Sequence, residues 1–229
     1  MIGILAELII SWVLLRIILR KNLAVLGFGI NKNRLVDLGA GLLLSALCCT
    51  VYNVMTAILA DNNWVRNKNT GWREAVSGSW WVLKSVLFEE LIFRGALLYI
   101  LIKKAGIIKG CIISSIAFGV YHWFSYNVFG NPLMMIIVFL MTAVAGAMFA
   151  FAFARTNSLY LPVGLHFGWN FFSIVVFSNG PLGQQLFVKE NSNTLEGTVS
   201  LIVFLFQLLA LPLLVFWYLR VRYRKVQKE

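Results

Sequence analysis

Three charged residues stand close together inside an apolar stretch of this sequence. Glu89, Glu90 and Arg94 lie in the apolar run from about 79 to 102, where a single charge in hydrocarbon costs roughly 2.5 to 3.5 kcal/mol even on a lenient insertion scale. On a helix, Glu90 and Arg94 form an i, i+4 pair that neutralises itself, which leaves the Glu89 carboxylate uncommitted. A carboxylate in a poorly solvated pocket can act as a general base, provided that a water molecule can reach it. The alternative is a buried ion pair or interhelical clamp without chemistry.

The two histidines of the chain also lie in apolar runs. His122 shares a helix face with Phe118, and His166 shares one with Asn170, because each pair is four residues apart. At about 1.5 Å per residue, His166, His122 and Glu89 lie about 12, 18 and 21 Å from the predicted cytoplasmic ends of their helices. The three side chains are therefore expected to meet near the middle of the membrane. Taken singly, each histidine fits a hydrogen-bonded interior role better than a catalytic one, and it is the combination with Glu89, Glu90 and Arg94 that favours chemistry.

The composition is that of an integral membrane protein. Hydrophobic residues make up 60% and charged residues 13% of the chain, against about 45–50% and 25% in soluble domains. We expect an all-α protein of about seven transmembrane helices in one bundle, with a polar cavity at mid-membrane. The polar stretches are too short to fold alone, so residues 1–229 are expected to form one transmembrane domain. Runs long enough to span about 30 Å of hydrocarbon occur at 2–19, 37–60, 79–102, 110–127, 132–154, 158–178 and 198–219.

The distribution of cations predicts how the chain is oriented in the membrane. If the runs alternate in direction, fourteen Lys and Arg residues fall on one side, and four fall on the other, namely Arg66, Lys68, Arg73 and Lys189. The positive-inside rule then places the N-terminus outside and the C-terminus in the cytoplasm, in a multi-pass protein of a bacterial plasma membrane. The net charge of +11 is spread over loops and a tail, which argues against nucleic acid as a partner and in favour of the lipid bilayer.

Three motifs, in order on successive runs, resemble those of the CPBP family of intramembrane proteases. They are Glu-Glu-x-x-x-Arg at 89–94, Phe-x-x-x-His at 118–122 and His-x-x-x-Asn at 166–170. This family contains the CAAX-processing Ras-converting enzyme and the bacterial Abi or bacteriocin self-immunity proteins. The resemblance covers residues 80–178 as a catalytic core. It implies an endopeptidase that hydrolyses a peptide bond of a membrane-associated protein or peptide.

The resemblance also implies roles for the motif residues. Amide hydrolysis needs an activated water, a stabilised oxyanion and a proton for the leaving amine. We expect Glu89 to act as general base and later as acid, with His122 holding the same water. His166 and Asn170 are expected to donate hydrogen bonds to the oxyanion. The remaining motif residues are expected to support this set: Glu90, Arg94 and Phe118.

A metal ion is the open question of this site. If a catalytic zinc were bound, its ligands would be His122, His166 and Glu89, with an open position for water. The H-E-x-x-H helix of zincins is absent from the sequence, and the same residues suffice for a metal-free, glutamate-activated water. Members of the family are described both ways. We favour no cofactor and keep zinc as the alternative.

Serine and cysteine chemistry is less well supported. Ser114 and Ser115 precede His122, but there is no Gly-x-Ser-x-Gly motif and no carboxylate to complete a triad. Cys48 and Cys49 lie in apolar surroundings with no cation nearby in sequence, which predicts unreactive thiols.

Two other functions compete with proteolysis. A membrane adaptor or bacteriocin immunity protein would have the same span pattern but no need for buried charges. A proton-coupled transporter would use intramembrane Glu and His, but no inverted repeat is apparent in the sequence. No feature of the sequence distinguishes a prenylated C-terminus from a peptide leader as the substrate.

Overall fold

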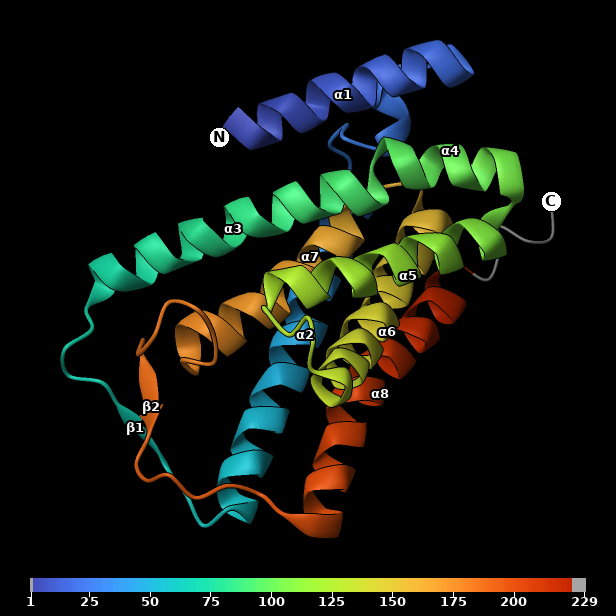
Figure 1. Ribbon diagram of the computed structural model, residues 1–229. Helices are drawn as coiled ribbons and strands as arrows, with labels where there is room; N and C mark the ends of the chain where they lie inside the picture. The colour runs from blue at the N-terminus through green and yellow to red at the C-terminus, as the bar shows by residue number, and fades with distance from the viewer. Residues whose placement is uncertain (1, 224–229) are drawn as a thin grey trace.

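The computed structural model describes residues 2–223 and consists almost entirely of helices (Figure 1). A 3-10 turn at Leu23–Leu26 follows the first helix, and a π-helical turn at Phe171–Val176 continues the seventh. The expected all-α membrane fold is confirmed. The helices are α1 (Ile2–Leu19), α2 (Lys32–Leu59), α3 (Trp72–Arg94), α4 (Ala96–Ala105), α5 (Ile107–Ser125), α6 (Pro132–Thr156), α7 (Tyr160–Asn170) and α8 (Gly197–Arg222).

Five of these helices, α1, α2, α5, α6 and α8, are long and apolar enough to cross a membrane. The expected run at 79–102 is not a single helix, because it divides at Gly95 into α3 and α4. A Cβ atom at Gly95 would run into the carbonyl oxygen of Leu91, so the break requires glycine. The run at 158–178 also differs from a regular span, since α7 has only 11 residues before the π-helical turn.

The helices run in two main directions. Helix α1 packs against α3 and α4, and these three cross the molecule at a steep angle to α2 and α8 (Figure 1). Helix α7 packs against α2, α3 and α6, and α5 packs along α6. A two-stranded antiparallel sheet, β1 (Trp64–Arg66) with β2 (Phe187–Lys189), joins the loops after α2 and after the π-helical turn. Helix α7 therefore lies where residues from several elements can meet.

Close packing of α2 against α7 sets the position of α7. A Cβ atom on Gly164 would lie 2.5 Å from the carbonyl oxygen of Leu38, and one on Gly41 would lie 2.8 Å from the backbone nitrogen of Leu165. Real side-chain carbons do not approach other atoms this closely, so each position needs glycine for the two backbones to touch. This contact holds the turn of α7 that precedes His166.

A buried carboxylate ties the end of α8 to the start of α2. Asp37 is 1% exposed and accepts hydrogen bonds from the Tyr218 hydroxyl at 2.6 Å and from Arg222 Nε at 2.8 Å. The hydroxyl of Tyr223 donates to the other oxygen of Asp37. Burying the Asp37 carboxylate is tolerated because it has these charge-assisted partners.

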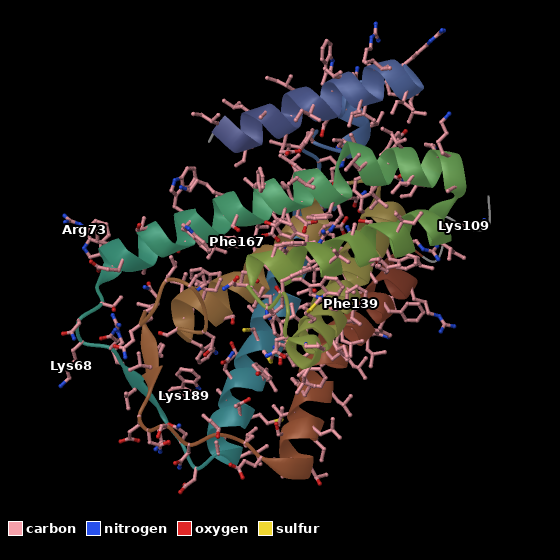
Figure 2. All side chains as sticks on the ribbon, viewed as in Figure 1. Lys68, Arg73, Lys109, Phe139, Phe167 and Lys189 are labelled. Carbon is pink, nitrogen blue, oxygen red and sulfur yellow. The ribbon has the colours of Figure 1, made fainter. Side chains whose placement is uncertain are left out.

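The labelled Lys and Arg residues lie in two regions of the molecule. In Figure 2, Lys68 and Lys189 lie near the β1–β2 sheet and Arg73 lies at the start of α3 on the same side of the view, whereas Lys109 lies on the opposite side. This is the grouping that the alternating arrangement of runs predicts. The side of the membrane that each group faces stays a prediction, and Arg224, Lys225 and Lys228 of the basic tail lie outside the described residues.

Candidate active site

The last two turns of α3 provide the charged part of the site. Arg94 and Glu90 are 0% exposed, and Glu89 is 8% exposed. Arg94 Nη2 lies 2.9 Å from Glu90 Oε1, the i, i+4 ion pair expected from the spacing. Apart from this ion pair, the N–H groups of Arg94 have no hydrogen-bond partner within residues 2–223. Arg94 is thus held by charge and packing.

Aromatic rings surround the Arg94 guanidinium. Its central carbon lies 4.1 Å from the ring centre of Phe118 and 4.8 Å from that of Phe149. Cation–π contacts of this kind strengthen when water is excluded. The ring of Phe149 also stacks on His166 with a centroid distance of 4.9 Å. Phe118 thus packs on Arg94, and Phe149, which the sequence analysis did not indicate, packs on both Arg94 and His166.

The Glu90 carboxylate has a second partner that its position in the sequence did not reveal. His166 Nδ1 lies 2.8 Å from Glu90 Oε1, the same oxygen that contacts Arg94. A carboxylate oxygen only accepts hydrogen bonds, so Nδ1 carries the proton and donates it. Glu90 thus orients the His166 ring as well as compensating Arg94. In neutral His166, the Nε2 lone pair is free.

His122 is oriented in the same way by a backbone group. Its Nδ1 lies 2.7 Å from the carbonyl oxygen of Phe118, one turn earlier on α5. Because a carbonyl oxygen cannot donate, the Nδ1 of His122 is the donor, and its Nε2 is left with a lone pair. The local helical geometry thus selects the tautomer of His122, and a tertiary contact selects that of His166.

Both free nitrogens face Glu89. His122 Nε2 lies 3.9 Å and His166 Nε2 lies 3.8 Å from Glu89 Oε2. This oxygen is buried and has no hydrogen-bond partner within the described residues, while Oε1 of the same carboxylate lies 3.4 Å from the Ser85 hydroxyl. The structure thereby brings together three side chains that lie 33 and 44 residues apart in sequence.

These three groups are all hydrogen-bond acceptors when the histidines are neutral. Acceptors that converge in a buried site need a donor or a cation between them. A water molecule has two protons to donate, and a protonated histidine supplies one. The geometry therefore suits a water held between a carboxylate and two imidazoles, which is the arrangement that general-base hydrolysis requires.

The spacing of Glu89, His122 and His166 differs from the spacing of zinc ligands. Ligands of a tetrahedral zinc at 2.0–2.1 Å lie about 3.3 Å apart, whereas the Glu89–histidine separations are 3.8 and 3.9 Å. Within residues 2–223, no group of three or more His, Cys, Asp or Glu side chains is arranged to hold a metal ion. The Glu89–histidine separations are thus about 0.5 Å longer than those of a tetrahedral zinc site, and the metal-free site stays a prediction.

A cavity of about 130 Å³ opens beside the two histidines. Asn170 of α7 lines it together with His122 and His166, so three of the four expected catalytic residues line this cavity, and Glu89 lies next to the histidines but is not among the lining residues. Most of the lining is apolar, and one side is formed by α8, which the three motifs do not include. Three polar residues in the lining escaped the sequence analysis: Tyr126, which directly follows the end of α5, Thr142 of α6 and Gln207 of α8.

The chain was compared with known proteins. Residues 71–172 match a family model described as "Rce1-like: Type II CAAX prenyl endopeptidase Rce1-like". No curated protein and no solved structure matches the chain. The matched residues contain all three motifs and end just after Asn170, whereas α1, α2 and α8 lie outside them. The match over residues 71–172 supports the resemblance to the CPBP family of intramembrane proteases that the three motifs indicate.

Proposed function

We propose that this protein is an intramembrane endopeptidase in which Glu89 activates a water molecule to hydrolyse a peptide bond. The observation that carries the proposal is the convergence of Glu89 Oε2 with the Nε2 atoms of His122 and His166. The family match supports endopeptidase activity in general. The residues and their roles are our proposal.

In the first step, Glu89 removes a proton from the water while the oxygen attacks the carbonyl carbon of the scissile bond. The lone pair on His122 Nε2 holds the second water proton and so orients the attacking oxygen. The products of this step are a tetrahedral intermediate with a negatively charged oxygen and a protonated Glu89. In the second step, Glu89 gives its proton to the leaving nitrogen as the carbon–nitrogen bond breaks.

The oxyanion needs hydrogen-bond donors. The Asn170 amide lies on the cavity wall beside the histidines and can donate to it. His166 can donate through Nε2 only as an imidazolium, and the Glu90 carboxylate on its Nδ1 stabilises that charge. This partnership resembles the support that a buried aspartate gives to the histidine of a serine protease triad. One such donor contributes about 3 to 4 kcal/mol to lowering the barrier.

The low-dielectric surroundings increase the effect of each of these charges. The aromatic rings of Phe118 and Phe149 pack against Arg94 and the histidines, and electrostatic interactions are stronger in such apolar surroundings than in solvent. The proposed mechanism routes no step through a metal ion.

The substrate is proposed to be a membrane-associated protein or peptide that enters laterally from the bilayer. The cavity lies among α5, α6, α7 and α8, three of which are apolar enough to span a membrane. We further propose that the protein lies in a bacterial plasma membrane with its C-terminus in the cytoplasm, on the basis of its cation distribution. A prenylated C-terminus is one substrate candidate, since the matched family is described as a prenyl endopeptidase.

The test uses the purified protein in liposomes and two peptides with a fluorophore and a quencher. Both peptides end in a CAAX sequence, and only one is farnesylated. Wild type is expected to cleave at least one of them, and Glu89→Gln and His122→Ala are each expected to lower the rate at least about 100-fold.

Glu74→Gln is the matched control, because Glu74 is exposed at the start of the same helix and its capping of Gly71 is possible for glutamine too. Its rate is expected to stay within about twofold of wild type. Equal rates for wild type and Glu89→Gln would refute the proposed mechanism, and a wild-type protein that cleaves neither peptide would refute the proposed function for this substrate class.

A further inference from the structure

Helix α8 carries one polar side chain in the middle of an otherwise apolar span. From Leu201 to Trp217, Gln207 is the only residue with an amide, hydroxyl or charged group. Burying an amide without a partner costs free energy, so a lone glutamine in a membrane helix calls for an explanation. Gln207 is half-buried and lines the same cavity as His122 and His166.

A second polar group on α8 comes from its backbone. Pro212 lies inside the helix and has no N–H, so the carbonyl of Leu208 lacks its usual i+4 donor. Leu208 and Pro212 both line the cavity, and the carbonyl released by a proline lies between the two residues on that helix face. The part of α8 that lines the cavity thus has a side-chain amide and, on the next residue, a carbonyl without its usual helical donor.

The turns of α8 that follow Pro212 fix the position of this part of the cavity wall. Tyr218 and Arg222 bind Asp37 of α2, as described above, and this anchors the last turns of α8. Helix α8 also packs against α6 (Figure 1). Its polar pair is therefore held across the cavity from the histidines and does not belong to a loosely attached helix.

We propose that Gln207 and the Leu208 carbonyl bind the main chain of an extended substrate next to the scissile bond. A peptide in a membrane cavity has N–H and C=O groups that need partners, and a glutamine amide can both donate and accept. The Leu208 carbonyl accepts from a second N–H, in the manner of an added strand. This inference rests on the proposed function and extends it to α8, which lies outside the matched residues 71–172.

The first test compares the kinetics of three variants on the cleaved peptide. Gln207→Leu is expected to raise KM about three- to tenfold, the effect of one lost hydrogen bond, with kcat within about twofold. Pro212→Ala restores the N–H that pairs with Leu208, so it is expected to raise the melting temperature and also to raise KM. A purely structural role for Pro212 predicts no loss of affinity in a more stable protein. Thr142→Val is the control, because the Thr142 hydroxyl lines the cavity but already donates to Val138.

The second test identifies the bonded group on the substrate. Single peptide bonds of the cleaved peptide are replaced by esters, one at a time, and binding is measured to the inactive Glu89→Gln protein. At one position, the ester is expected to weaken binding to Glu89→Gln about three- to tenfold but to have no effect when Gln207→Leu is added. Ester effects that are identical in both proteins, or a KM unchanged by Gln207→Leu, would overturn this inference alone. A wild type that cleaves neither peptide would instead remove the proposed function on which it rests.

Discussion

The ion pair between Glu90 and Arg94 offers a sharp test of the energetics of the site. Both side chains are fully buried, and a single Glu90 oxygen contacts Arg94 Nη2 at 2.9 Å and His166 Nδ1 at 2.8 Å. Removing one member of a buried pair leaves the other charge uncompensated, which costs about 3 to 5 kcal/mol. Against a total stability of about 5 to 15 kcal/mol, Glu90→Gln is expected to remove about a fifth or more of the free energy of unfolding.

Replacing both partners should be much less harmful than replacing either. Arg94→Met alone leaves the Glu90 carboxylate buried with only His166 as a partner, whereas the double variant Glu90→Gln/Arg94→Met removes both charges of the pair together. Because the two residues are in contact, we expect a coupling energy of about 2 to 3 kcal/mol, so that the double variant is more stable than the sum of the single effects predicts.

The measurement is equilibrium unfolding in mixed micelles, followed by tryptophan fluorescence. Glu190→Gln is the control, since Glu190 is an exposed acid that bonds Asn63 in a loop, and its effect is expected to stay within about 0.5 kcal/mol. Costs below about 1 kcal/mol for both single variants, or strictly additive effects, would refute the argument that the pair is buried from solvent and mutually compensating.

Three further predictions concern packing, anchoring and metal. Gly41→Ala is expected to lower the free energy of unfolding by about 1 to 3 kcal/mol, because its Cβ atom would lie 2.8 Å from the backbone of Leu165. Gly39→Ala on the same helix meets nothing within 4 Å and should be neutral or stabilising. The two variants are compared by unfolding in parallel, and equal costs would count against the packing argument. Asp37→Asn is expected to lose about 1.5 to 3 kcal/mol by weakening charge-assisted hydrogen bonds to α8, measured by thermal denaturation in detergent. Proteolysis by wild type is expected to persist after a chelator and dialysis, with the cleavage rate as the readout; loss of activity that zinc restores would overturn the metal-free mechanism.

Local spacing was enough to predict several features of this protein. Hydrophobic content identified a helical membrane protein, since only helices satisfy the backbone in hydrocarbon over runs of this length. The four-residue spacing predicted the contact between Glu90 and Arg94, because one helical turn places such residues side by side. The three motifs also indicated the family, which the match over residues 71–172 supports.

Other features depend on tertiary structure. The division of the run 79–102 at Gly95 arises from a backbone path that only glycine permits, although the run has the length of a single span. The bond between Glu90 and His166, which selects the tautomer of that histidine, joins residues 76 positions apart. Hydropathy does not encode such pairings, because they depend on which helix faces meet.

The division between the two kinds of information has a simple physical origin. A sequence by itself specifies what each residue costs in lipid and which residues share a face of their own helix, and both are local quantities. Whether Glu89, His122 and His166 point at one spot, and which helix supplies the remaining wall of the cavity, is decided by the packing of α7 against α2 through glycine and of α8 onto Asp37. Those contacts are long-range, so they become visible only once the chain is folded.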